Sequence, residues 1–182
     1  MNGPVALWHT EHVYFRRLLE LLQLELDAFH RGERPNYELM LDIVAYLREY
    51  SDACHHPRED VAFQRLAQRC PELRLDLARL TQEHGVIARA GETLRHQLED
   101  ILSGTLIPRA EVEVAAATYL VYYGNHIAKE DELVLERAAR LLTAEDWQAV
   151  REAALSAPDP LFGEAPAERY RALRRQIGAN TH

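Results

Sequence analysis

The stretch 71–104, PELRLDLARLTQEHGVIARAGETLRHQLEDILSG, decides the fold. It opens with a proline and closes with a glycine, which are favoured at the first turn of a helix and just past its end. Between them, core-type residues recur at alternate spacings of four and three, which predicts one long helix with a buried seam. The seam comprises Leu73, Leu77, Leu80, His84, Ile87, Gly91, Leu94, Leu98 and Ile101. His84 therefore occupies a position where an apolar side chain is expected.

Three more long helices are predicted around this one, over residues 5–30, 35–68 and 108–142. Pro57 interrupts the second of them, and we expect a kink there because proline removes a backbone hydrogen bond and restricts the preceding residue. Four long helices with short loops predict an all-α, antiparallel up-down-up-down four-helix bundle over residues 1–142. Residues 143–182 are expected to form a C-terminal helical extension packed on the bundle. Thr143 is predicted to cap one short helix there, and another is expected over 165–177.

The composition argues against several classes of function. The net charge is −8, with 29 acidic against 21 basic residues, whereas a nucleic-acid surface needs clustered positive charge. No stretch reaches the roughly 18 apolar residues of a membrane span, and the first residues lack the features of a signal peptide. We therefore expect a cytoplasmic protein in which Cys54 and Cys70 are reduced.

Two segments pair a histidine with a glutamate four positions later. They are His55-His-Pro-Arg-Glu59 and His126-Ile-Ala-Lys-Glu130. On a helix, this spacing points both side chains the same way, one turn apart. Each pair can therefore present an imidazole and a carboxylate to one metal ion, or let the carboxylate bridge two ions.

The two halves of the chain repeat this arrangement. Glu11-His12 precedes the first pair and Glu83-His84 the second, at similar distances, so the halves look like copies related by about 71 residues. Buried glutamates on a seam need a compensating cation or proton. A pseudo-twofold bundle predicts a dinuclear metal centre in which each ion receives two imidazoles and both share two glutamates. Its ligands would be His12, His55, Glu59, His84, His126 and Glu130.

Over about residues 8–142, these motifs resemble the haemerythrin-like (HHE cation-binding) family. The resemblance implies a non-haem, carboxylate-bridged centre of two iron ions that binds O2 or NO, with the six residues above as ligands. Manganese or zinc would also suit these donors. The oxygen carriers of the family use a fifth histidine one turn from the third-helix ligand. That position is Leu80 here, which argues against reversible oxygen carriage.

Three kinds of function remain open at this point. The first is a binding protein for O2 or NO in sensing, storage or stress response. The second is a di-iron enzyme of iron–sulfur cluster repair or of peroxide or NO reduction, although the repair proteins of the family carry an N-terminal cysteine-bearing domain that is not found in this sequence. The third is an interaction protein in which residues 143–182 dock a partner or form a homodimer.

Some ligand assignments also stay open. His9 lies one turn before His12 and is a candidate fifth ligand. His56 and Asp60 repeat the spacing of His55 and Glu59, shifted by one residue. Asp131 could take the place of its neighbour Glu130 if the helix is distorted there.

Other residues near the seam have two readings each. Glu11 and Glu83 either orient histidines from behind or belong to a solvated face. Tyr50 and Tyr123 either donate hydrogen bonds near the site or pack in the core. Cys54, next to the first histidine pair, is either a redox-sensitive thiol or a small buried residue.

Overall fold

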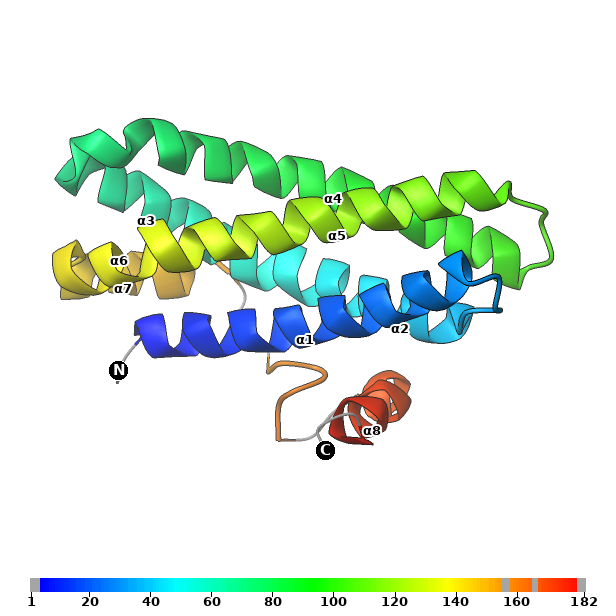
Figure 1. Ribbon diagram of the computed structural model, residues 1–182. Helices are drawn as coiled ribbons and strands as arrows, with labels where there is room; N and C mark the ends of the chain where they lie inside the picture. The colour runs from blue at the N-terminus through cyan, green and yellow to red at the C-terminus, as the bar shows by residue number, and fades with distance from the viewer. Residues whose placement is uncertain (1–3, 155–157, 165–166, 180–182) are drawn as a thin grey trace.

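The computed structural model describes residues 4–154, 158–164 and 167–179, and all the elements in these ranges are helices. The long ones lie side by side along one direction (Figure 1). They are α1 (Pro4–His30), α2 (Tyr37–Tyr46), η1 (Leu47–His55), α3 (His56–Arg69), α4 (Arg74–Leu102) and α5 (Arg109–Leu133), with α2, η1 and α3 following one another without a loop. The all-helical class is therefore confirmed.

Local sequence explains where these helices end. Gly32 and Gly104 follow α1 and α4 with φ of 81° and 91°, the left-handed conformation that glycine adopts without strain. The Asn36 side chain accepts a hydrogen bond of 3.0 Å from the backbone N–H of Leu39 and so caps α2. A single turn of 3-10 helix, η2 (Pro71–Leu73), leads into α4.

The predicted seam of α4 is buried except at Ile101, which is half-buried, and the buried side chains of the helices form two apolar clusters with a polar layer between them. In α4, for example, Leu77 and Leu80 belong to one cluster and Ile87 and Leu94 to the other, with His84 between. Helix α1 shows the same order, from Trp8 through His12 to Phe15. The histidines therefore occupy one level of the bundle, between two clusters of apolar side chains.

The break in the second long segment differs from the prediction. A π-helix, η1, ends two residues before Pro57, and Pro57 lies in the first turn of α3, where no N–H is needed. The backbone N–H of His56 bonds to Ser51 O, five residues back, as in a π-turn. Such wide turns hold more residues, which accommodates the two extra residues of the first repeat, where Tyr50 lies five residues before His55 whereas Tyr123 lies three before His126.

The C-terminal part begins with a second difference from the predicted helices. The helix predicted over 108–142 is divided at Val134 into α5 and α6 (Leu135–Leu141). The predicted cap of the next helix, α7 (Ala144–Glu152), is confirmed, since Thr143 and Asp146 form a capping box. The helix predicted over 165–177 is observed as η3 (Glu168–Tyr170) and α8 (Arg171–Ala179); residues 165–166 lie outside the described residues.

Both C-terminal helices contact the long helices. Helix α7 packs on α3, and Trp147 contacts Trp8 of α1 with ring centroids 5.4 Å apart. Helix α8 contacts α1 and α2 and buries Leu173 against their core. Before it, Phe162 stacks on Tyr14 at 3.9 Å. In the described part of the chain, no helix combines the length and apolarity needed to cross a bilayer.

Candidate metal centre

The six predicted ligands lie together in the polar layer of the bundle. His12 comes from α1, His84 from α4, and each His-x-x-x-Glu pair from one of the remaining long segments. All six side chains are buried, and none of these residues is more than 6% exposed. Helical periodicity thus brings together residues that are up to 118 positions apart in the chain, from His12 to Glu130.

The two glutamates lie between the histidines of the two halves. Glu59 Oε1 is 3.2 Å from His12 Nε2 and 2.8 Å from His55 Nε2, while its Oε2 is 3.4 Å from His84 Nε2. Glu130 Oε1 is 2.9 Å from His126 Nε2 and 3.7 Å from His84 Nε2, while its Oε2 is 3.5 Å from His12 Nε2. Each carboxylate therefore spans both pairs of imidazoles.

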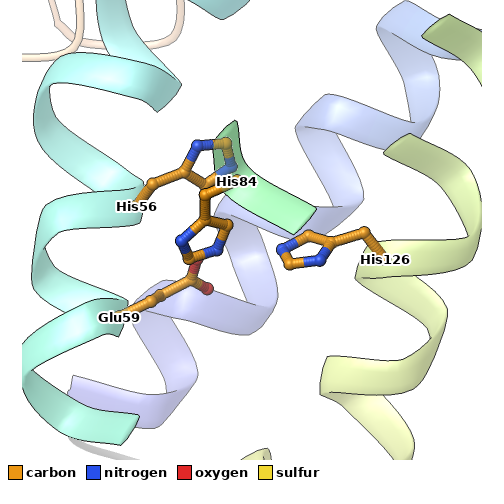
Figure 2. Close-up of side chains that lie close together, drawn as sticks. All are labelled: His56, Glu59, His84 and His126. Atoms are coloured by element: carbon orange, nitrogen blue, oxygen red, sulfur yellow. The ribbon is translucent and has the colours of Figure 1, made fainter. Parts of the chain in front are cut away.

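Potential metal-binding atoms form two groups that share one residue. His12, His55 and Glu59 make up the first group, and within it the donor atoms all lie within 4.8 Å of one another. The second group meets the same criterion and contains His56, Glu59, His84 and His126, whose side chains are drawn in Figure 2. Because Glu59 belongs to both groups, two ions bound there would share its carboxylate.

Several donor atoms at the centre of the layer lie close to one another, but among the described residues none of their contacts has the geometry of a hydrogen bond. They are Glu59 Oε2, His84 Nε2, His126 Nε2 and both carboxylate oxygens of Glu130. Buried polar atoms without partners cost free energy, so they are uncommon in folded proteins and call for an explanation. Imidazole nitrogens and carboxylate oxygens are a donor set for Fe, Mn or Zn. The residues present therefore fit a metal centre.

A carboxylate lies behind the Nδ1 atom of each of the four predicted histidine ligands. The pairs are His12 with Asp131 at 2.7 Å, His55 with Glu11 at 2.8 Å, His84 with Asp60 at 2.9 Å and His126 with Glu83 at 3.1 Å. An Nδ1–H that donates to a carboxylate leaves the Nε2 lone pair for a metal and fixes the orientation of the ring. All four Nε2 atoms are thus oriented towards Glu59 and Glu130.

These contacts decide several readings that the sequence left open. Glu11 and Glu83 lie behind histidines and are not on a fully solvated face. Asp60 and Asp131 also lie behind histidines, with Glu59 and Glu130 at the centre. This role of the two aspartates was not predicted from the sequence, although a Glu-Asp pair ends both repeats.

Glu11 links the first histidine group to its surroundings. It contacts His55 and accepts hydrogen bonds of 2.8 Å from Tyr50 Oη and from Arg58 Nη2. Burial alone would raise the pKa of Glu11, but the hydrogen bond with His55 and the charges of His55 and Arg58 lower it to about 2. Glu11 is therefore ionised throughout the physiological range.

The carboxylates around the histidines, of which Glu59 and Glu130 are buried and Asp60 and Asp131 half-buried, make the imidazole nitrogens strongly attractive to cations. Burial by itself would lower the pKa of His12, but hydrogen bonds with Asp131 and Glu59 raise it to about 10. For His84, burial is likewise outweighed by Asp60, Glu130 and Glu59, which raise the pKa to about 11. The same negative charges would stabilise a metal cation at the Nε2 atoms, in competition with protons.

The remaining candidates lie around the centre. His9 is exposed and lines a cavity of about 630 Å³ together with Asp131, and it belongs to neither metal-binding group. Tyr123 is buried and its hydroxyl donates to Ser51 Oγ at 2.5 Å. Cys54 is half-buried, and its thiol is free.

An all-helical chain whose buried imidazoles and carboxylates converge in this way is a cation-binding helical protein. Comparison with known families agrees: the model described as the Hemerythrin HHE cation binding domain matches residues 3–138. The chain belongs to this family, and the resemblance predicted from its motifs is confirmed. Neither the curated proteins nor the solved structures contain a significant match.

Proposed function

We propose that this chain is a carboxylate-bridged, non-haem di-iron protein that binds O2 or NO. His12 and His55 would hold one ion, and His84 and His126 the other. Glu59 and Glu130 would bridge the two. The observation that carries this proposal is the position of Glu59, which is shared by both metal-binding groups and has one oxygen without a hydrogen-bond partner.

The surroundings suit a reactive metal centre. Apolar clusters on both sides of the polar layer limit the access of water, and the carboxylates behind the Nδ1 atoms hold the imidazoles in one orientation. Bound iron would supply redox chemistry and open coordination positions for a small diatomic ligand. Manganese or zinc would fit the same donors, so the identity of the metal is part of the proposal.

The proposal includes the arrangement of the chain. We infer an antiparallel up-down-up-down bundle over residues 1–142 that carries the centre, and an extension over residues 143–182 that packs on it. The family match, which ends at residue 138, supports this division. We assign the protein to the cytoplasm and to sensing, storage or stress response.

The test begins with metal analysis of protein purified without oxygen. Two irons per chain are expected, together with a near-ultraviolet absorption that changes reversibly when NO or O2 is added and removed. Glu59→Gln should lose both ions, whereas Glu132→Gln, at an exposed position of α5, should keep them. Two zinc ions per chain would overturn the iron assignment, and steady turnover of peroxide or NO with a reductant would favour an enzyme over a binding protein.

A further inference from the structure

His56 lies beside the proposed metal ligands but is not one of the six. It is 4% exposed and follows His55 at the junction of the π-helix with α3. Its ring stacks on that of His84, with centroids 4.2 Å apart and planes 10° apart. Figure 2 shows the two rings one above the other, with His126 facing them. A buried imidazole in this place needs partners for both of its nitrogen atoms.

The surroundings of His56 resemble those of the other four histidines, although its contact with a carboxylate is longer than theirs. Its Nδ1 lies 3.3 Å from Oδ1 of Asp52, so a carboxylate stands behind this ring as well. With Nδ1 directed at Asp52, Nε2 is the atom available as a ligand. The metal-binding group that contains His84 and His126 includes His56 as a donor within 4.8 Å of the others.

The two halves of the chain differ at this position. The residue that follows His126 in the second repeat is Ile127, which is buried in an apolar cluster. The first metal-binding group therefore contains two imidazoles and the second three. This difference makes the two sides of the centre chemically unequal, although the rest of the repeat is closely matched.

We propose that His56 is a fifth imidazole ligand, bound to the same ion as His84 and His126. This inference rests on the proposed function, because it requires a dinuclear centre. It implies that the ion held by His12 and His55 has fewer protein ligands.

One other partner competes for the Nε2 atom. Ser51 Oγ lies 3.1 Å from it, and this hydroxyl also accepts the hydrogen bond from Tyr123. If His56 turns its lone pair to a metal, Ser51 retains Tyr123 as a partner, so the exchange leaves no buried hydroxyl unsatisfied. The serine contact is thus compatible with a ligand role.

The first measurement is made on the native sequence. Apoprotein prepared by chelation is reloaded with Co2+, and the strongly shifted, exchangeable Nδ1–H signals of metal-bound imidazoles are counted by proton NMR. Five signals are expected. Four signals with two bound ions would overturn the role of His56 and leave the dinuclear centre intact, whereas a chain that binds no metal would overturn the proposed function as well.

A matched set of variants provides the second measurement. His56→Phe keeps an aromatic ring on His84 but removes both nitrogens, and Ser51→Ala removes only the competing hydroxyl. In His56→Phe, Co2+ titration should show that the affinity for one of the two ions falls by more than about tenfold. Tenfold is the lower limit seen when even an outer partner of a metal ligand is lost. Ser51→Ala should bind both ions at least as tightly as the native chain. Equal affinities in the native chain and His56→Phe would contradict the proposal.

Discussion

Nδ1 of His12 lies 2.7 Å from Oδ1 of Asp131, which joins the first long helix to the last at the level of the metal centre. Arg16 also bonds to this carboxylate, through Oδ2. Asp131 thus orients a histidine that is distant in sequence, from the side of the ring opposite to the Glu59 and Glu130 carboxylates.

Asp131→Asn should weaken metal binding by about 10- to 100-fold while leaving the stoichiometry at two, because His12 keeps its lone pair but loses the carboxylate that aligns it. Titration of the apoprotein with Fe2+ or Co2+ measures this. Glu132→Gln, one residue further along and exposed, serves as the control. A variant that loses one ion completely would instead place Asp131 among the direct ligands.

Removal of the metal should destabilise the fold. The centre is built from buried charges, and a ligand that binds only the folded state at a free concentration of 1,000 times its Kd adds about 4 kcal/mol to the free energy of unfolding. Urea titrations with and without chelator should differ by several kcal/mol. In Glu59→Gln the two curves should coincide, and a difference that persists in this variant would show that the ions bind elsewhere.

Alanine substitutions at Gly91 and Gly124 should change the free energy of unfolding in opposite directions. A Cβ at Gly91 would lie 2.9 Å from the ring of Tyr119, whereas a Cβ at Gly124 would meet nothing within 4 Å. Gly91→Ala should therefore lower the free energy of unfolding by about 1–3 kcal/mol through overpacking. Gly124→Ala should raise it by up to about 1 kcal/mol, because alanine favours the helix. Thermal and urea unfolding of the two variants provide the comparison.

The cap of α7 should make a contribution that depends on pH. Thr143→Ala should cost about 1 kcal/mol of unfolding free energy. Hydrogen bonds from the Thr143 backbone N–H and side chain, together with the charge of Arg69, lower the pKa of Asp146 below its ordinary value. A lowered folded-state pKa means that this contribution is present above the ordinary aspartate pKa, near 4, and is lost as the pH falls below it. Asp146→Asn should show a weaker acid dependence in urea titrations between pH 3 and 7.

Packing of the C-terminal extension can be tested at Leu173. Its side chain is 1% exposed in α8 and belongs to the same apolar cluster as residues of α1 and α2. Leu173→Ala should lower the free energy of unfolding by about 2–5 kcal/mol. Leu75→Ala, at a position that is 75% exposed, should have little effect. Equal, small effects in both variants would mean that the extension does not share the stability of the bundle.

The helices and the inward-facing histidines could be predicted from the sequence, because side chains buried on one face of a helix recur at spacings of three and four residues. His12 and His84 interrupt otherwise apolar stripes, so their inward direction can be read without a structure. The position of the helix break could not be predicted in this way. Pro57 is the obvious disruptive residue, yet it lies in the first turn of α3, and the wide turns of the π-helix precede it without a distinctive sequence pattern.

The carboxylates behind the histidines were harder to assign for a different reason. Asp60 and Asp131 are each one position after a glutamate on a seam, which turns them about 100° away from it on a regular helix. Whether they face solvent or a neighbouring helix depends on how the helices are packed. Their contacts with His84 and His12 are therefore properties of the assembled bundle.

The donors of the centre are distributed along the chain from His12 in α1 to Glu130 near the end of α5. A nascent chain still attached to the ribosome lacks His126 and Glu130 until α5, which follows the other long helices, has been made. The full set of proposed ligands therefore cannot assemble before α5 has been translated and has packed against the other helices. If two ions bind as proposed, their capture would therefore follow the docking of α5 and would be a late event in the life of the molecule.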